Sequence, residues 1–170
     1  MSPPASADLP LLVQSERPQD APAVEALLDH AFGPGRFVKS SERVREIARF
    51  RPDLSFCAFE GERLVGTVRQ YQVRVGDASL IFLGPLAVMS DTRKSGVGGL
   101  LVARACHAAQ AAGERAILLV GDEPYFGRFG FKAEPARTIV MPGPVDQRRV
   151  LVRALIEGGD QDLSGAVGGA

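Results

Sequence analysis

The feature that most constrains the fold is an apolar run that passes through a basic, glycine-rich loop into a helical repeat. Residues 80–88 (LIFLGPLAV) are apolar almost throughout, which is typical of a strand covered on both faces. The next eleven residues include Arg93, Lys94 and glycines at 96, 98 and 99. An apolar stripe at helical spacing follows over 97–112 and ends at Gly113. Backbone amides and the positive end of a helix meet at this junction, so the sequence predicts a phosphate-binding site.

Two common phosphate motifs do not fit this loop. A Walker A motif needs a glycine followed by Lys-Ser or Lys-Thr, whereas here Lys94 and Ser95 precede the glycines. A dinucleotide fingerprint beginning at Gly96 would need a third glycine where Leu101 stands, and it would follow the first strand rather than the fourth. A P-loop is therefore excluded, and a dinucleotide site is disfavoured.

Alternation and turn residues predict the remaining elements. Runs linked by short connections should form antiparallel hairpins. Because proline cannot donate to a strand ladder, Pro85 beside Gly84 indicates a bulge or a point where pairing stops. The expected strands are 11–16, 54–59, 64–75, 79–88 and 116–120, with 139–141 and 150–155 as a final antiparallel pair. Helices are expected between Asp20 and Gly33, from about Ser40 to Ala48, over 97–112, and briefly over 124–129.

Length and composition limit the chain to one domain and narrow its partners. A chain of 170 residues that is 45% hydrophobic can build one core. We expect this domain at 11–156, between a flexible leader at 1–10 and a flexible, glycine-rich tail at 157–170. The 20 basic residues balance the 20 acidic ones, so no net field attracts nucleic acid or a membrane. No long apolar segment or signal peptide is evident, and the expected location is cytoplasmic.

The remaining polar and sulfur-containing residues are given structural interpretations. Cys57 and Cys106 lack metal-site spacing and are expected to be small buried hydrophobes, so no metal is expected. The arginines at 43, 45, 49 and 51 are interpreted as a solvated face balanced by Glu42 and Glu46, although they could also contact an anionic acceptor or a coenzyme phosphate.

Three segments in order carry a recognisable pattern. Residues 93–98 (RKSGVG) match Gln/Arg-x-x-Gly-x-Gly/Ala after a strand that ends at 86–88, residues 64–67 read LVGT, and residues 125–131 read YFGRFGF. Together they resemble the Gcn5-related N-acetyltransferase (GNAT) superfamily, with its third strand at 64–67 and its YxxxGF element at 125–131. The segments 83–88 and 121–131 resemble its YhbS-like branch most. The resemblance implies a mixed α/β fold. Its central, mostly antiparallel, seven-stranded sheet would be splayed between strands 4 and 5 and accompanied by about four helices.

The resemblance also implies acetyl-CoA, or another acyl-CoA, as co-substrate. Amides of the loop would hold the coenzyme pyrophosphate, and the edge of the fourth strand would pair with the pantetheine arm. The N–H of Val88 would stabilise the oxyanion. The expected coenzyme-binding residues are Leu86, Ala87, Val88, Arg93, Lys94, Ser95, Gly96, Val97, Gly98, Gly99, Tyr125 and Phe126.

The proton-transfer groups are less constrained. Asp122, directly after the fifth strand, is the preferred base, with Glu123, Glu60 or a water chain as alternatives; Asp122 could equally be a helix N-cap. The tyrosine that serves as acid in the family falls on Phe126, and a tyrosine stands one place earlier at Tyr125. Either Tyr125 reaches the sulfur, or water protonates it, or the protein binds acyl-CoA without transfer.

The resemblance implies transfer of an acetyl or short acyl group from acyl-CoA to a primary amine, by direct attack in a ternary complex. The acceptor would be a small molecule or a protein amine, and the resemblance places its pocket at Phe32, Arg36, Phe37 and the segment 141–147. The alternative is a non-catalytic module that binds acyl-CoA or an acyl-carrier protein. The oligomeric state stays open, with a homodimer included.

Overall fold

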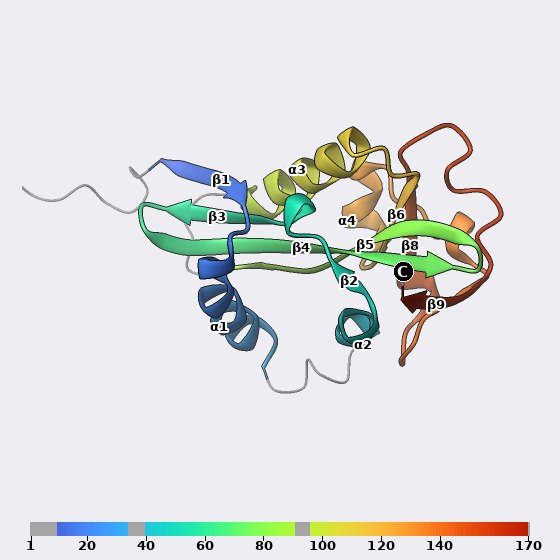
Figure 1. Ribbon diagram of the computed structural model, residues 1–170, viewed down its shortest axis with the longest axis horizontal. Helices are drawn as coiled ribbons and strands as arrows, with labels where there is room; N and C mark the ends of the chain where they lie inside the picture. The colour runs from blue at the N-terminus through green and yellow to red at the C-terminus, as the bar shows by residue number, and fades with distance from the viewer. Residues whose placement is uncertain (1–9, 34–39, 91–95, 170) are drawn as a thin grey trace, which may run out of the picture.

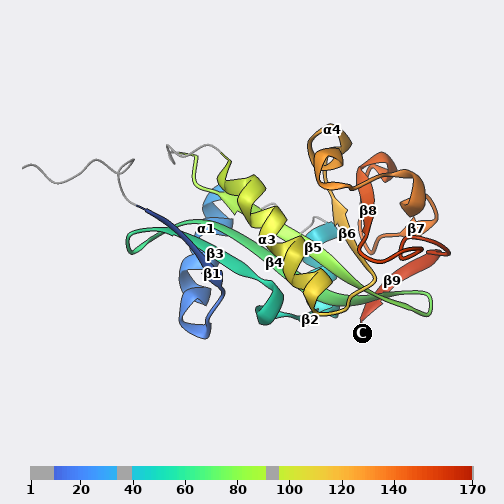
Figure 2. The ribbon, with the colours of Figure 1, turned by 90° about the horizontal axis from the view of Figure 1, so that it is seen from above.

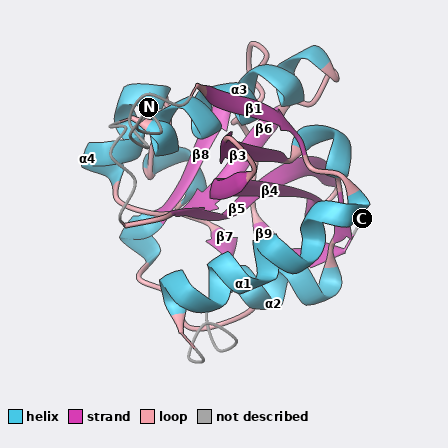
Figure 3. Ribbon diagram, turned by 90° about the vertical axis from the view of Figure 1, so that its left-hand side faces the viewer, coloured by secondary structure: helices cyan, strands magenta, loops and turns pink. Residues whose placement is uncertain are grey.

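The protein is a three-layer α/β structure with a sheet between two groups of helices. The computed structural model describes residues 10–33, 40–90 and 96–169, so the expected leader lies outside them apart from Pro10. α1 (Ala21–Phe32) and α2 (Ser40–Ile47) cover one face of the sheet, and α3 (Val97–Ala111) covers the other (Figures 1 and 3). A short helix, α4 (Glu123–Phe126), follows the fifth of the expected strands.

All seven expected strands are present, and two short ones are added. The sheet runs in the order β1-β3-β4-β5-β6-β8, with β2 and β9 paired to the free side of β4 and β7 paired to β9. The strands are β1 (Leu11–Ser15), β2 (Arg49–Phe50), β3 (Phe56–Glu60), β4 (Arg63–Val75), β5 (Ala78–Val88), β6 (Ala116–Val120), β7 (Ile139–Val140), β8 (Val150–Ala154) and β9 (Gly165–Gly169). Antiparallel pairs dominate, as expected. The predicted pairing of 139–141 with 150–155 is wrong, because β8 pairs with β6 and β7 runs parallel to β9.

The predicted bulge in β5 is confirmed. Gln70 lies opposite Leu83, and Val68 lies opposite Leu86. Gly84 and Pro85 of β5 therefore lie together opposite a single residue of β4. Gly84 has a φ of 150°, and the peptide bond between Gly84 and Pro85 is cis. The extra residue interrupts the regular ladder at the middle of the sheet.

Glycine and small side chains bring α3 close to the sheet. A Cβ atom on Gly66 of β4 would lie 2.9 Å from Leu101 Cδ1 and 3.2 Å from Val97 Cγ1, so glycine is needed for this approach. α3 also contributes Ala105 and Cys106 to the core, where Cys106 is free and buried. Cys57, on the opposite face, is also free and buried, and the burial raises the pKa of its thiol to about 12. Both cysteines thus behave as the small hydrophobes that were expected.

The glycine-rich tail departs from the sequence prediction. Residues 165–169 were expected to be flexible, but they form β9, which pairs with β4 from Val73 to Val75. Leu163 and Val167 are buried against the same part of the core, and they provide the apolar burial that the glycines do not. β3, β2 and β9 thus cover the outer side of β4 in succession (Figure 2). No helix in the described part of the chain is long and apolar enough to cross a membrane.

Two neighbouring glycines provide a test of this tail. A Cβ atom on Gly169 would overlap the carbonyl oxygen of Ile47 at the end of α2, whereas one on Gly168 would meet nothing within 4 Å. We expect Gly169→Ala to lower the free energy of unfolding by about 1–3 kcal/mol, and Gly168→Ala to change it by less than about 0.5 kcal/mol. Urea unfolding followed by circular dichroism measures both. Equal effects of the two changes would show that β9 does not dock as described.

Candidate active site

β5 has an open edge in the middle of the sheet. It pairs with β6 only where Ile81 and Phe82 face Ile117 and Leu118. Beyond that point β6 continues beside β8, at Leu119 and Val120, while β5 continues beside β4. The sheet is therefore splayed between the fourth and fifth of the expected strands, and the divergence begins at the bulge, as predicted.

The backbone groups of this edge point into the opening. The N–H of Met89 donates to the carbonyl of Val65 at 2.8 Å, which makes these two a hydrogen-bonded pair. Because such pairs alternate in an antiparallel ladder, the next pair, Gly66 and Val88, is of the non-hydrogen-bonded kind. The N–H and C=O of Val88, and those of Leu86 two residues earlier, are thus directed away from β4. They are the polar groups of a strand edge that another extended chain could pair with.

The N-terminus of α3 lies beside this edge. Gly96 occupies its N-cap position with a φ of 84°, a conformation that glycine adopts without penalty, and its carbonyl accepts from the N–H of Leu100 at 2.9 Å. The next two amides, from Val97 and Gly98, belong to the first turn, whose N–H groups have no partner within the helix. Arg93, Lys94 and Ser95 lie outside the described residues. The described part of the predicted loop thus supplies an exposed helix N-terminus next to Val88.

The side chains of Tyr125 and Phe126 point to different surroundings. A Cβ atom on Gly98 would lie 3.4 Å from the Tyr125 hydroxyl oxygen and 3.7 Å from Val88 Cγ2, so this hydroxyl lies at the start of α3 and close to the β5 edge. The Phe126 ring packs on Gly121, where a Cβ atom would overlap it, and meets Phe131 edge to face at 6.0 Å. Tyr125, rather than Phe126, therefore presents a proton donor at the opening.

Aromatic and cationic contacts hold Tyr125 in this position. Its ring lies 4.8 Å from that of Phe126 and 5.9 Å from that of Phe129, and the Arg128 guanidinium sits 4.3 Å from its centroid. Phe129 in turn approaches Gly99, where a Cβ atom would lie 3.4 Å from its Cζ. The glycines at 98 and 99 thus leave room for the side chains of Tyr125 and Phe129.

Asp122 lies at the N-cap of α4 but does not cap it with its side chain. Its backbone carbonyl accepts from the N–H groups of Tyr125 and Phe126, while its carboxylate accepts from Arg149 Nε at 3.2 Å. The side chain is 72% exposed. Asp122 is therefore the N-cap residue that the sequence allowed, without a side-chain cap, and it also lines the opening. Glu60 is buried at the far end of β3 and does not line it.

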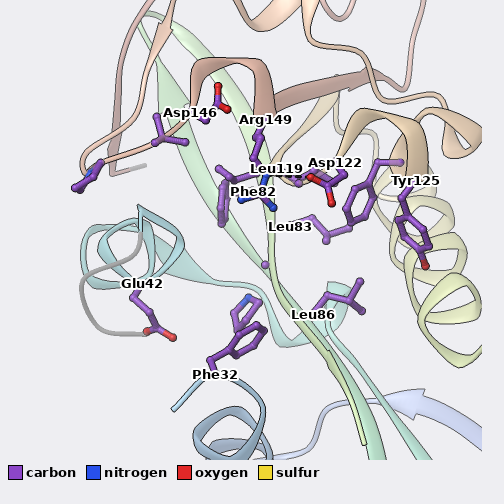
Figure 4. Close-up of a pocket in the computed structure, with 17 residues that line it drawn as sticks. Phe32, Glu42, Phe82, Leu83, Leu86, Leu119, Asp122, Tyr125, Asp146 and Arg149 are labelled. Atoms are coloured by element: carbon purple, nitrogen blue, oxygen red, sulfur yellow. Dashed lines mark hydrogen bonds and ion pairs between the residues drawn. The ribbon is translucent and has the colours of Figure 1, made fainter. Parts of the chain in front are cut away.

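A cavity of about 440 Å³ occupies the opening (Figure 4). Expected site residues that line it are Leu86, Asp122, Tyr125, Phe126 and Phe32, whereas Arg36 and Phe37 lie outside the described residues. The sequence analysis missed Glu42 and Arg149. The full lining is Phe32, Glu42, Phe82, Leu83, Gly84, Pro85, Leu86, Leu119, Val120, Gly121, Asp122, Tyr125, Phe126, Pro144, Val145, Asp146 and Arg149. The expected acceptor segment 141–147 thus contributes three residues to this wall.

Glu42 ends a chain of ion pairs that runs behind the cavity. Arg69 on β4 binds both carboxylate oxygens of Glu16 at 3.0 Å and one oxygen of Glu25 at 2.9 Å. Arg45 of α2 also binds Glu25 and lies 3.5 Å from Glu42. Burial alone would lower the pKa of Arg69, but the bonds to Glu16 and Glu25 outweigh it and raise that pKa. The interpretation of Arg45 and Glu42 as members of a solvated face is therefore wrong.

No group of three or more His, Cys, Asp or Glu side chains within residues 10–33, 40–90 and 96–169 is placed to hold a metal ion. The polar side chains that line the described cavity are a phenol, carboxylates and one guanidinium.

A splayed sheet with an open strand edge and a glycine-rich helix N-terminus at one cleft defines the class of fold that the sequence motifs indicated. The chain belongs to the acetyltransferase (GNAT) family, whose family model matches residues 22–131. It is 31% identical over 124 residues to a protein of Escherichia coli K12 described as uncharacterized N-acetyltransferase YhbS. The match covers 72% of this chain and 74% of that protein.

Two solved structures have the same fold. The crystal structure of the GNAT family N-acetyltransferase YhbS from E. coli, in complex with CoA, superposes with a TM-score of 0.77 at 26% identity, over 98% of this chain and 92% of that one. A GNAT family acetyltransferase from Brucella melitensis, in complex with acetyl-CoA, gives a TM-score of 0.68 at 24% identity, over 93% and 94% of the two chains. The resemblance to the YhbS-like branch is confirmed.

Proposed function

We propose that this protein transfers an acetyl or similar short acyl group from acyl-CoA to a primary amine, by direct attack in a ternary complex. The observation that carries the proposal is the open edge of β5, where the N–H and C=O groups of Leu86 and Val88 point into the cleft. The E. coli YhbS structure contains CoA and the Brucella structure contains acetyl-CoA, which supports the same co-substrate here.

The coenzyme would lie along two surfaces that meet at Val88. Its pyrophosphate would bind the amides of 93–98 at the start of α3, where the helix dipole favours an anion. Its pantetheine amides would pair with Leu86 and Val88 as an added strand. The thioester would then lie beside the Tyr125 hydroxyl, which is close to Gly98 and Val88, between the coenzyme loop and the cavity.

The chemistry would then use one amide and one phenol of this chain. The neutral amine attacks the thioester carbonyl, and the N–H of Val88 donates to the oxyanion, a contribution of about 3 kcal/mol. When the carbon–sulfur bond breaks, the leaving thiolate takes the proton of Tyr125 Oη. Tyr125 then regains a proton from solvent, to which its side chain is 37% exposed.

Asp122 is the proposed acceptor of the proton that the amine gives up. Deprotonating an alkylammonium with a pKa near 10.4 costs about 4.6 kcal/mol at pH 7. A carboxylate or an ordered water at the cleft is therefore useful as the acceptor of this proton. Asp122 lines the cavity on the same side as Tyr125 (Figure 4). The Arg149 contact fixes the direction of its carboxylate.

A turnover assay tests the proposal. The protein is incubated with acetyl-CoA and a panel of primary amines, thiol release is followed with a chromogenic disulfide, and products are identified by mass spectrometry. We expect acetylated amine and free coenzyme A in equal amounts. Tight coenzyme binding with no product from any amine or protein lysine would instead support the non-catalytic acyl-CoA or carrier-protein module that Phe126 first suggested.

A further inference from the structure

An arginine and an aspartate lie side by side at one end of the paired strands β6 and β8. Val120, at the end of β6, pairs with Val150, at the start of β8. Asp122 therefore follows β6 at the place where Arg149 precedes β8, and the N–H of Gly121 donates to the Arg149 carbonyl at 2.9 Å. The Asp122 carboxylate accepts from Arg149 Nε at 3.2 Å, and both side chains line the cavity. One wall of the cavity thus carries adjacent positive and negative charge (Figure 4).

Both members of this ion pair keep hydrogen-bonding capacity for a ligand. Arg149 uses only its Nε in the contact with Asp122, and its two Nη groups make no hydrogen bond within the described part of the chain. The side chains of Arg149 and Asp122 are 49% and 72% exposed, so neither is enclosed by the protein. A guanidinium with unused Nη groups can bind a carboxylate through two parallel bonds, and a carboxylate beside it can accept from an ammonium group.

The other two carboxylates of the described lining have guanidinium partners outside it. Asp146 binds Arg148 at 2.9 Å, and Glu42 lies 3.5 Å from Arg45. Neither Arg148 nor Arg45 lines the cavity. Each carboxylate of the described wall therefore has a cationic partner. By electrostatic complementarity, such a wall favours a ligand that carries both charges over one with a large net charge.

Much of the remaining lining is apolar. Phe82 is buried in the core, and Val120 and Val145 are half-buried against the same cluster of core residues. All three line the cavity, and Val120 stands two residues before Asp122. An apolar side chain of a ligand would be removed from water here, which is favourable in proportion to the area that is covered.

We propose that the acceptor is a free α-amino acid with an apolar side chain, bound through its carboxylate by Arg149 and through its ammonium group by Asp122. The two charges of such a zwitterion are carried on one carbon atom. The Arg149–Asp122 contact of 3.2 Å places charges of the opposite sign in an equally direct contact with each other. This assignment rests on the proposed function of the same cleft and names the acceptor class.

The transfer step would remove part of this match. The ammonium gives one proton to Asp122, and the neutral nitrogen forms a bond to the thioester carbon. The carbon–sulfur bond breaks as the sulfur takes the proton of Tyr125, and the nitrogen releases its second proton to solvent, from which Tyr125 is reprotonated. The products are an N-acyl amino acid and coenzyme A. Because an amide nitrogen carries no charge, the product loses its attraction to Asp122, which favours its release.

Four compounds of similar size test the assignment without any variant. Leucine has all the required groups, leucinamide and 3-methylbutan-1-amine lack the carboxylate, and asparagine replaces the apolar side chain with a polar one of nearly the same shape. Calorimetry on the protein saturated with coenzyme A should show leucine binding at least about tenfold more tightly than each of the others. Equal affinities, no binding of leucine, or tighter binding by any of the other three would overturn the assignment.

Two neighbouring arginines identify the group that binds the carboxylate. Arg149→Gln should reduce the preference for leucine over leucinamide to less than about twofold, because the variant lacks the charged, two-pronged donor. Its affinity for coenzyme A should stay unchanged, which shows that it is folded. Arg148→Gln makes the same change one residue earlier, at a side chain that is 89% exposed and outside the lining, and it should leave the preference intact. A preference that persists in Arg149→Gln would refute the role of Arg149.

The two proposals fail in different ways. If leucine binds through Arg149 but is never acylated, the amino acid site stands and the transferase function is wrong. If leucine, leucinamide and 3-methylbutan-1-amine are acylated with the same kcat/KM, the transferase function stands and the amino acid acceptor is wrong.

Discussion

Tyr125→Phe is expected to lower kcat about a hundredfold, while the KM for acetyl-CoA changes by less than about twofold. The change removes one hydroxyl and keeps the ring that contacts Phe126, Phe129 and Arg128, so the start of α3 stays packed. In the proposed mechanism the variant lacks the proton for the leaving thiolate, a contribution of general-acid catalysis in the range of about 10²- to 10⁴-fold. Steady-state kinetics with saturating amine separates kcat from KM.

The chain offers a matched control in its second tyrosine. Tyr71 is buried on β4 and does not line the cavity, so Tyr71→Phe removes the same atom away from the proposed chemistry. The kcat of the Tyr71→Phe variant should stay within about threefold of that of the unchanged protein. If Tyr125→Phe keeps full activity, water protonates the sulfur and Tyr125 is only a packing residue.

Gly98→Leu is expected to weaken coenzyme binding by at least about a hundredfold. The Cβ position at residue 98 already touches the Tyr125 hydroxyl and Val88 Cγ2 at ordinary distances, so a longer side chain must extend over the first turn of α3 and the β5 edge. Loss of even one or two hydrogen bonds to a charged diphosphate costs about 3 kcal/mol, which corresponds to this factor. Calorimetric titration with coenzyme A measures it.

Gly98→Ala is the control for this change. The single methyl would contact its neighbours at 3.4 Å and 3.7 Å, and coenzyme affinity should fall by less than about fivefold. Thermal unfolding of both variants should show the same midpoint within a few degrees, because Gly98 is only half-buried and a Cβ atom there makes ordinary van der Waals contacts. Unchanged affinity in Gly98→Leu would mean that the phosphates bind elsewhere.

Local signals were sufficient for the elements and for the opening of the sheet. Alternation, helical stripes and turn residues placed all seven expected strands and the helices within a few residues. The bulge was predictable because Pro85 lacks an N–H and stands beside a glycine in an otherwise continuous apolar run. A proline at that place leaves few alternatives to a break in the ladder, and the structure has the break there.

Features that depend on distant partners could not be predicted in this way. β9 is composed of residues that bury little by themselves, and it forms because β4 has an uncovered edge and Leu163 and Val167 find the core. Glu42 follows the pattern of an exposed helix, so nothing local marks it as buried. One signal was available: Arg69 stands at the centre of the longest expected strand, and a charge in that position requires carboxylates to accompany it. Glu16 and Glu25 are those partners.

The spacing within β5 has a consequence for how such a cleft arises. In a regular antiparallel strand, the backbone amides point alternately toward the two neighbouring strands. The bulge at Gly84 and Pro85, the doubled position, adds one residue and so shifts this alternation by one position. Removing Pro85 alone would leave Leu83, Leu86 and Val88 all turned to the β6 side, in an uninterrupted strand. In the present chain the doubled position coincides with the point where β5 parts from β6, and the amides of Leu86 and Val88 remain on the side that β6 leaves open.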